Sequence, residues 1–375
     1  MKIDAWLTIL AEQGGSDLFL STGAPPCAKI DGQLTPIAAD VLKPGEIAVI
    51  ADEIMDYTQR EEFRNELELN LAVSISGVGR FRVNVFNQRN QVSIVARHIV
   101  TNIPNWEDLG LPSLLTELIM EKRGLILFVG ATGSGKSTSL AALIDYRNAN
   151  NAGHIVTIED PIEMVESAFN QMQVHQSIGL TFSEGVRALL RQDPDIIMVG
   201  EIRDRATAEM AVQAALTGHL VLSTLHTNDA PTAISRLLDL AMPAHLIKAT
   251  LNGVIAQRLV RTLCPDCRGE VPCDTDAWKE LTGPTQLATP ATVFQPVGCL
   301  ECRNTGYLGR EGIYEIMPIT HTLLSHISSE SDIQQIPSAA IGEGMKTLRM
   351  AGAEKVAAGV TSIEEVLRVT PELGR

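Results

Sequence analysis

Aromatic side chains, basic charge and long apolar runs are all scarce in this sequence of 375 residues. Aromatic residues make up 4%, and 45 acidic residues against 30 lysines and arginines give a formal net charge of −15. A protein that binds the phosphate backbone of a nucleic acid needs a basic surface, so we expect no nucleic-acid partner, although a local basic patch is still compatible with this composition. No apolar run approaches the roughly 18 residues that a membrane-spanning helix requires.

The start of the chain and its cysteines are typical of a cytosolic protein. Asp4 interrupts the apolar stretch MKIDAWLTIL, so we expect no secretory signal peptide. In the cytosol, the six cysteines are better suited to metal binding than to disulfides. A hydrophobic content of 45% is ordinary for a globular protein with a substantial core. The length predicts two domains and an appendage.

The most specific motif in the sequence is GATGSGKS at positions 130–137, which fits the phosphate-loop pattern G-x-x-x-x-G-K-[ST]. An apolar, β-prone run, Leu125–Val129, precedes it, and a helix-like segment follows. Glycines let backbone N–H groups face phosphate oxygens, Lys136 can reach the β- and γ-phosphates, and Ser137 can bind Mg²⁺. The helix N-terminus adds a field that favours anions. We therefore predict an ATP and Mg²⁺ site made by Gly130, Ala131, Thr132, Gly133, Ser134, Gly135, Lys136, Ser137 and Thr138.

Residues 1–100 predict a small α/β domain, and the proline-flanked segment 101–112 predicts a linker. Alternation of polar and apolar residues indicates strands, and apolar spacing of three to four indicates helices. The expected helices are 5–13 and a helix-periodic stretch over 44–64; the expected strands are 17–21, 28–30 (followed by a hairpin signal at Asp31–Gly32), 69–75, 80–87 and 91–99.

Residues 113–263 alternate strand-like and helix-like segments, as a parallel sheet requires. The expected strands are 125–129, 154–158, 196–199 and 220–224. Acidic clusters, EDPIE ending at Glu163 and GEIRD containing Glu201, follow the second and third strands, where open α/β sheets bind ligands. In isolation such acids are more often solvated loop residues. Next to a phosphate loop they are candidates to hold Mg²⁺ and to orient or deprotonate water.

Two histidines and two cysteine pairs are the remaining candidate groups. His219 and His226 bracket the fourth strand, and we expect both to act near the nucleotide. Cys264-x-x-Cys267 and Cys299-x-x-Cys302 supply four thiolates, which suit tetrahedral Zn²⁺ in a closed structural site over residues 264–302. Their separation exceeds that of the usual zinc ribbon, and redox pairs or unused thiols are the alternatives. Residues 303–375 read as a helical region, with Ile313, Ile316 and Leu324 among its core residues.

In this order, the segments GATGSGKST, TIEDPIE, DPDIIMVGEIRD and TGHLVLSTLHT resemble the Walker A, Asp box, Walker B and His box of the secretion ATPases of type II secretion and type IV pili. The resemblance covers nearly the whole chain. It implies an α/β fold with a PAS-like N-terminal domain and a RecA-like P-loop ATPase core at 113–263, assembled as a homo-hexameric ring. It also implies that Glu163 is the base that activates water, that Glu201 acts at Mg²⁺ or the water, and that the N-terminal arginines Arg82 and Arg97 close over the nucleotide.

The two halves resemble different members of this family. SDLFLSTGAPP and GRFRVNVFNQRN are similar to pilus retraction ATPases of the PilT and PilU type. We expect this protein to lack the large leading domain that is common in assembly members. AQRLVRTLCPDC and GCLECRNTGYLGREGIYE are similar to secretion and assembly ATPases of the GspE and PilB type. The resemblance implies work at the cytoplasmic face of the inner membrane with a platform protein and a paralogous retraction ATPase. We expect a retraction role; assembly or secretion is the alternative.

Two further readings belong to other functional classes. A nucleic-acid motor such as a RecA-like helicase would share the phosphate loop, but the acidic composition and the four ordered boxes argue against it. A scaffold that binds ATP without turnover would not need Lys136, Glu163 and Glu201 together. Stimulation of ATP turnover by DNA would favour the first reading, and absence of turnover in the purified protein would favour the second.

Overall fold

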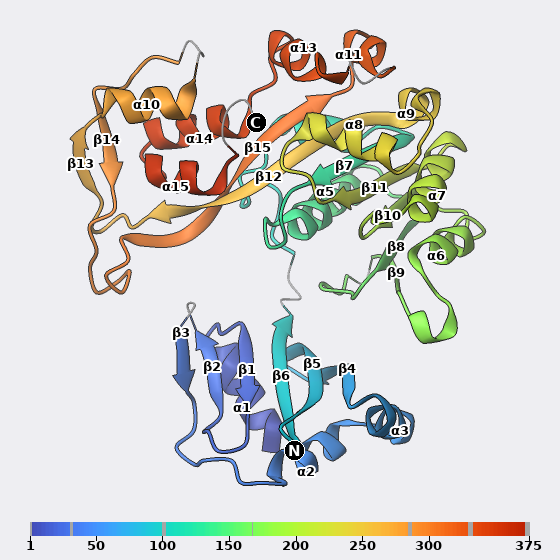
Figure 1. Cartoon of the computed structure of the whole chain (residues 1–375), viewed down its shortest axis with the longest axis vertical. Coiled ribbons are helices and arrows are strands. Elements are labelled where there is room, and N and C mark those ends of the chain that lie inside the picture. The colour runs from blue at the N-terminus through green and yellow to red at the C-terminus, as the bar shows by residue number, and fades with distance from the viewer. Residues whose placement is uncertain are drawn as a thin grey trace. The chain divides into compact units, whose positions relative to one another are not determined.

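The computed structural model describes residues 2–30, 33–99, 103–166, 168–283, 287–328 and 333–371, in which the chain forms two compact units (Figure 1). The first unit covers Met1–Asn102 together with the short segment Glu163–Glu166, and the second is built from Ile103–Ile162 and Ser167–Arg375. The hairpin turn predicted at residues 31 and 32 lies outside the described residues, as do the first two positions of the predicted linker.

A six-stranded antiparallel sheet in the order β3-β2-β1-β6-β5-β4 forms the first unit. Its strongest pattern is in β4, where Leu69, Leu71 and Val73 are buried and their neighbours are exposed. This alternation is typical of a sheet with one face on a core. The elements are α1 (Lys2–Glu12), β1 (Asp17–Leu20), β2 (Cys27–Ile30), β3 (Gln33–Pro36), α2 (Glu46–Ile54), α3 (Tyr57–Glu66), β4 (Glu68–Ile75), β5 (Gly79–Gln88) and β6 (Gln91–Ile99).

The helix-periodic stretch 44–64 is helical, as predicted, and forms two helices that are separated at Met55. Met55 is extended, with φ −94° and ψ 139°, and it ends α2. Asp56 then begins α3: its side chain accepts a hydrogen bond from the backbone N–H of Gln59, and the Gln59 side chain accepts one from the N–H of Asp56. This reciprocal cap satisfies two backbone donors that a helix start leaves open, so a new helix begins there.

The second unit is organised around a seven-stranded sheet in the order β15-β12-β7-β11-β10-β8-β9. All neighbouring pairs are parallel except β12 with β15. The strands are β7 (Gly124–Val129), β8 (Ile155–Glu159), β9 (Asn170–Gln173), β10 (Ile196–Val199), β11 (Leu220–Leu225), β12 (Leu251–Leu263) and β15 (Tyr307–Pro318). The four central strands confirm those predicted from the sequence.

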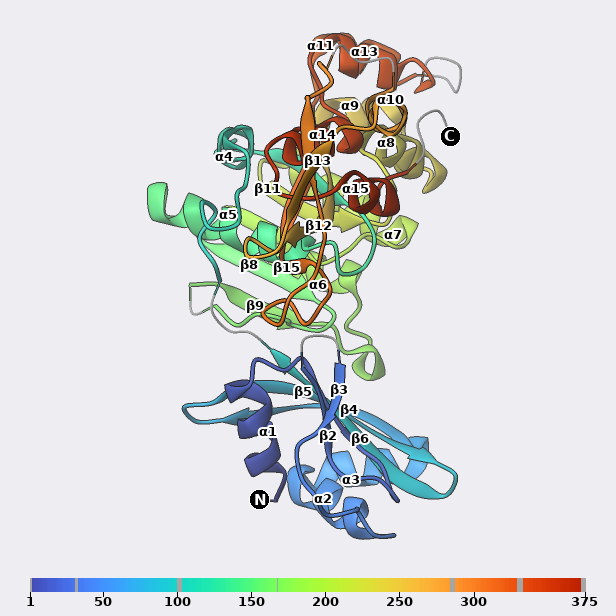
Figure 2. The same ribbon diagram turned by 90° about the vertical axis from the view of Figure 1, so that its left-hand side faces the viewer.

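Helices cover both faces of this sheet (Figure 2). Along β7, Leu125, Leu127 and Val129 join one core cluster, and Ile126 and Phe128 join the other. One face carries α4 (Ser113–Ile119) and α5 (Lys136–Asn150). The opposite face carries α6 (Phe182–Leu189), α7 (Arg205–Leu216), α8 (Ala230–Asp239) and α9 (Ala244–Thr250). Burial on both faces explains why the strands are continuous apolar runs.

The region from residue 303 onward is not helical throughout, which corrects the prediction from the sequence. Tyr307–Pro318 form β15, a long strand that pairs with β12. Ile313 is buried on this strand, as expected of a core residue. Helices begin only after β15: α11 (His321–His326), α13 (Ile336–Gly342), α14 (Leu348–Ala357) and α15 (Ile363–Val369).

A buried carboxylate fixes α15 against β12. Glu365 is 1% exposed and accepts hydrogen bonds from both Arg368 and Arg261, including the backbone N–H of Arg261 at 3.0 Å. Burial alone would raise the pKa of Glu365, but the two guanidinium groups lower it to about 2. Arg261 also lies over the ring of Tyr307, 4.0 Å from its centroid. These interactions hold α15 against β12 at Arg261, close to the end of that strand.

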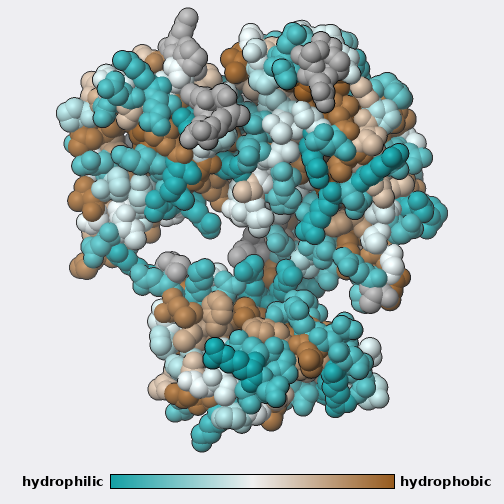
Figure 3. Space-filling model, viewed as in Figure 1, coloured by the Kyte–Doolittle hydropathy of each residue, from teal (hydrophilic) through white to brown (hydrophobic). Residues whose placement is uncertain are grey.

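In the space-filling view (Figure 3), hydrophilic residues cover much of the visible surface and hydrophobic residues form small separate groups. No helix in the described part of the chain is long and apolar enough to span a membrane.

Candidate functional site

The predicted phosphate loop connects β7 to the N-terminus of α5. Gly133 and Gly135 have φ of 77° and 88°, and Gly135 occupies the N-cap position of α5. The N–H of Gly130 donates to the carbonyl of Leu225, which joins the start of the loop to the end of β11. The Lys136 Nζ atom donates to the carbonyl oxygens of Gly130 and Ala131 at 2.9 and 3.0 Å. The lysine amine is thus folded over the loop, on the side where a phosphate would be bound.

Polar atoms behind the loop lack partners in the described structure. They are Ser134 Oγ, Gln257 Oε1 and one terminal nitrogen of Arg258, all buried. A Cβ atom on Gly130 would lie 2.6 Å from the carbonyl oxygen of Gln257, so only glycine fits this position. The glycine cradle, the buried lysine and these polar groups suit a polyanionic ligand. Gln257 and Arg258 belong to β12, and neither was among the site residues predicted from the sequence.

The acid after β10 and the histidine after β11 lie together. His226 Nε2 is 3.1 Å from Glu201 Oε2, and Arg203 lies 2.5 Å from the other carboxylate oxygen, Oε1. Glu201 is largely buried, with a side chain 12% exposed, whereas those of His226 and Arg203 are 48% and 66% exposed. Because β10 and β11 are parallel neighbours and β11 pairs with β7, these groups end at the same sheet edge as the phosphate loop.

The second acidic cluster separates into a buried and an exposed carboxylate. Glu159 ends β8, is buried, and accepts hydrogen bonds from Thr157 Oγ1 and Gln171 Nε2 at 2.6 and 3.0 Å. Glu163 is exposed in the irregular segment between β8 and β9, outside the second unit. Its role as a base stays a prediction.

His219 needs correction. It lies at the beginning of β11, where its Nδ1 donates to the carbonyl of Ala214 at 2.9 Å and approaches Thr217 Oγ1 at 3.2 Å. The residue after it, Leu220, pairs with Gly124 at the start of β7. Six residues of strand, roughly 20 Å, separate it from the edge that carries His226. Within one chain, His219 therefore holds the turn before β11 and is not part of the cluster at the phosphate loop.

Arg82 and Arg97 belong to the first unit and lie directly opposite each other on β5 and β6. Arg97 Nε donates to Asp17 Oδ1 at 2.8 Å, and the Arg97 side chain is 65% exposed while that of Asp17 is 9% exposed. The two arginines therefore form a pair of cations on one sheet face, with one of them oriented by a buried carboxylate. Their role over the nucleotide stays a prediction.

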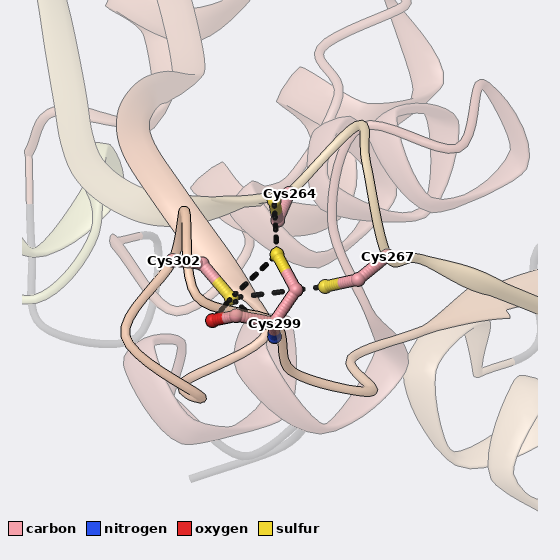
Figure 4. Close-up of side chains that lie close together, drawn as sticks. All are labelled: Cys264, Cys267, Cys299 and Cys302. Carbon is pink, nitrogen blue, oxygen red and sulfur yellow. Dashed lines mark hydrogen bonds between the residues drawn. The ribbon is translucent and has the colours of Figure 1, made fainter.

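The four cysteines of the two C-x-x-C pairs converge, as predicted (Figure 4). Sulfur–sulfur distances are 3.8 Å for Cys264 and Cys299, 3.7 Å for Cys267 and Cys302, and 3.7 Å for Cys299 and Cys302. A tetrahedron with metal–sulfur bonds of about 2.3 Å has edges of about 3.8 Å, so this cluster has the size of a four-thiolate metal site.

Backbone donors surround these sulfurs. The N–H of Gly298 donates to Cys267 Sγ at 3.3 Å, and the N–H groups of Cys299 and Gly306 donate to Cys302 Sγ at 3.2 Å. Burial would raise the pKa of the Cys302 thiol, but these two donors and the neighbouring cysteines lower it to about 6. Burial raises the pKa of Cys264, and it raises that of Cys267 to about 12, so the protein itself stabilises the thiolate at Cys302 but not at these two positions. N–H donors around the sulfurs are typical of metal–thiolate sites.

The long interval between the cysteine pairs holds structure of its own. It contains β13 (Gly269–Pro272), α10 (Thr275–Thr282) and β14 (Thr292–Gln295), and the two strands pair with each other. Trp278 and Leu281 of α10 are buried in the same core as α14 and α15. The extra residues therefore attach the cysteine cluster to the C-terminal helices, which a short ribbon would not do.

Comparison with known proteins finds one family whose model covers nearly the whole chain. A family model described as "Type II/IV secretion system protein" matches residues 2–368. The chain is 53% identical over 273 residues to the type IV pilus assembly ATPase TfpB of Acinetobacter baylyi, an alignment that covers 72% of this chain and 46% of TfpB. It thus spans less than half the length of that relative. It is 44% identical over 279 residues to the type IV pilus ATPase PilU of Pseudomonas aeruginosa, with 72% of each chain covered.

A solved structure of the pilus retraction motor PilT with bound ADP matches with a TM-score of 0.79 and 33% sequence identity. The match covers 98% of this chain and 97% of that chain. It supports the α/β architecture and the mixed sheet of the second unit.

Glu315 is a buried carboxylate that was not among the residues singled out from the sequence. It is 4% exposed on β15, and its two oxygens accept the backbone N–H of Ala230 at 2.7 Å and of Leu348 at 3.2 Å. One carboxylate therefore closes the N-termini of both α8 and α14. Burial, with a contribution from nearby Asp229, raises the pKa of Glu315 to about 7 even though both N–H donors lower it.

This raised pKa predicts a pH dependence of stability. The folded chain keeps the Glu315 proton between pH 4.5 and 7 while the unfolded chain releases it, so the free energy of unfolding should fall by about 3 kcal/mol across that interval. In Glu315→Gln, this contribution to the pH dependence of the free energy of unfolding should be lost. The matched control Glu364→Gln, a change at an exposed carboxylate, should keep it. Urea unfolding at several pH values measures the difference; equal slopes in both variants would contradict the assignment.

Proposed function

Because the chain belongs to the Type II/IV secretion system protein family, we propose that it is a motor ATPase that hydrolyses ATP at the phosphate loop of its second unit. The observation that carries this proposal is the meeting of three elements at one sheet edge. These are the glycine cradle at 130–135, the buried Lys136, and the pair formed by Glu201 and His226. A phosphate-binding loop beside a carboxylate and its histidine is the arrangement that phosphoryl transfer to water requires.

Each group has a distinct role in this proposal. Lys136 leaves the two loop carbonyls and pairs with the β- and γ-phosphates. Ser137 and Glu201 hold the Mg²⁺ that accompanies ATP and neutralises its negative charge. Glu163 takes the proton of the attacking water, and His226 fixes the orientation of Glu201. Positioning and electrostatic stabilisation account for most of the rate in such reactions.

The first unit completes the site in an assembly. We propose that this unit is PAS-like, that the chain forms a homo-hexameric ring, and that Arg82 and Arg97 neutralise nucleotide charge when the units close. Support comes from the opposed placement of the two arginines on one face and from the bond that orients Arg97. Guanidinium groups are always charged and bind phosphates in a fixed geometry, which suits this role.

The four-cysteine cluster fits a structural Zn²⁺ ion. Sulfur–sulfur distances of 3.7 to 3.8 Å agree with tetrahedral zinc–thiolate geometry, and the cluster offers four protein ligands, which leaves no position for water. The cluster lies between β12 and β15 in the chain. This position supports a structural role, because the ion would link the two C-x-x-C segments next to the C-terminal helices.

For the direction of work, we propose pilus retraction or an accessory retraction role. The likeness to the retraction motor PilT runs along nearly the full length of both chains, and PilU is a second relative among pilus ATPases. In this role the ring works in the cytoplasm, at the inner face of the inner membrane. It acts on a platform protein there, with a paralogous retraction ATPase and without nucleic acid.

Assembly or secretion is the second candidate. The 53% identity to the assembly ATPase TfpB favours it, and so does the cysteine module that the sequence shares with secretion and assembly members. The chemistry at the phosphate loop is the same for both directions, so only the work done by the ring distinguishes them.

Substitutions at the loop and at the proposed base test the chemistry. Lys136→Ala should weaken ATP binding and abolish turnover, because it removes the cation that faces the phosphates. Glu163→Gln should bind ATP normally and lose turnover by about 10²-fold or more, the scale of a general base. Glu209→Gln, a change at an exposed carboxylate of α7, is the control. Turnover by Glu163→Gln close to that of the control would assign the base to another group.

Metal analysis tests the cysteine cluster. The purified protein should hold about one zinc per chain, and Cys299→Ser should lose it and lower the melting temperature because folding of this region is coupled to metal binding. Cys273→Ser is the matched control, since Cys273 lies in the same module but outside the cluster. Zinc-free protein from a preparation without chelators would refute the zinc assignment.

A deletion strain tests the direction. Loss of retraction with surface pili retained or increased is the result expected for a retraction motor. Loss of all surface pili, or of protein secretion, would instead identify the assembly or secretion motor. Complementation with the Glu163→Gln variant shows whether the phenotype depends on ATP turnover or only on the presence of the protein.

A further inference from the structure

A cavity of about 480 Å³ lies directly beside the pair formed by Glu201 and His226. It is enclosed by the segments that follow β10 and β11 and by one side of α8, all within the second unit. Its lining residues are Ile202, Arg203, His226, Thr227, Asn228, Thr232, Arg236 and Asp239. The volume would hold on the order of a dozen water molecules, so a small hydrated anion fits with room to move.

The charges around the cavity favour an anion. The guanidinium groups of Arg203 and Arg236 line it together with the imidazole of His226, and Asp239 is the one carboxylate among the lining residues. Two other acids nearby are used elsewhere: Asp204 accepts the N–H of Thr207 and Asp229 that of Thr232, each as a helix cap. Within the described ranges of the chain, no side-chain hydrogen bond or ion pair holds Arg236. Its charge is therefore available to the cavity.

Hydrogen-bond directions point the same way. Arg258 donates to Asn228 Oδ1 at 3.0 Å, which leaves the amide NH₂ of Asn228 as a donor at the cavity wall. Arg203, in contrast, is held by Glu201 Oε1 at 2.5 Å, and this carboxylate partly screens its charge. Arg236 is the strongest unscreened donor in the cavity, and Asn228 is the second.

The position of the cavity selects the anion. In the proposed reaction ADP stays on the phosphate loop, so orthophosphate leaves on the side away from the loop. Glu201 and His226 lie at the same sheet edge as the loop, and His226 also lines the cavity. We propose that this cavity is a binding subsite for the product orthophosphate on its way out. The inference rests on the ATPase activity proposed above and extends it to product release.

Equilibrium binding of inorganic phosphate to the full-length protein saturated with MgADP tests the subsite. Arg236→Gln should weaken phosphate binding about tenfold, because it removes a charge-assisted hydrogen bond. Asp239→Asn should tighten binding roughly threefold or more, because it removes the negative charge of the one carboxylate among the lining residues. A tighter complex cannot result from misfolding, so the second variant protects the test from a folding defect.

The matched control is Arg187→Gln, which removes an exposed arginine of α6 that pairs with Glu184, away from the lining residues. Its phosphate affinity should equal that of the unaltered protein. The proposal is overturned if Arg236→Gln and Asp239→Asn also bind phosphate with unaltered affinity, or if saturating MgADP abolishes phosphate binding and so assigns it to the nucleotide loop.

ATP turnover of the same proteins separates this proposal from the proposed function. If the protein turns over ATP but the substitutions at Arg236 and Asp239 leave its phosphate affinity unchanged, the subsite proposal is refuted and the ATPase proposal stands. If these substitutions change the phosphate affinity but the protein does not turn over ATP, the ATPase assignment is refuted. The cavity then remains an oxyanion-binding site. With both present, phosphate should inhibit turnover at lower concentrations in Asp239→Asn than in the unaltered protein, and at higher concentrations in Arg236→Gln.

Discussion

Parallel pairing of β7, β11, β10 and β8 is the constraint on which the arrangement of the candidate site depends. Parallel strands end at the same edge of a sheet, so the loops that follow them meet there even when they are far apart in the sequence. The hydrogen bond from Gly130 to the carbonyl of Leu225 ties two of these ends together. Glu201 and His226 then approach within 3.1 Å because their strands are neighbours. The flanking helices bury both faces and keep this edge rigid.

Features set by local patterns were predictable from the sequence. The four central strands are apolar runs that end in polar clusters, and the two cysteine pairs bring their own tight turns. The division of 44–64 into two helices was also readable, because Asp56 and Gln59 have the spacing of a helix cap. The error at His219 came from closeness in sequence: the two ends of one strand lie at opposite edges of the sheet.

Other features were hidden because distant residues determine them. β12 carries Gln257 and Arg258 at buried positions, a pattern that does not read as a core strand. β15 carries Glu315, whose partners are 85 and 33 residues away. A buried carboxylate in a strand is unfavourable unless it has hydrogen-bond partners. Its position at Glu315 is explained only by the two helix N-termini whose N–H groups donate to it.

The cysteine module interrupts a hairpin, and this has an evolutionary consequence. Leu263 and Tyr307 are register partners, so the chain leaves the sheet and returns to it at one point, where an insertion or deletion leaves the strand pairing intact. Yet Trp278 and Leu281 share a core with α14 and α15, and Arg268 donates to the carbonyl of Gly359. A lineage that lost the module would uncover the underside of its C-terminal helices and would have to remodel them too. Through these contacts the cysteine module and the C-terminal helices form one packed block, so a change in either would require compensating changes in the other.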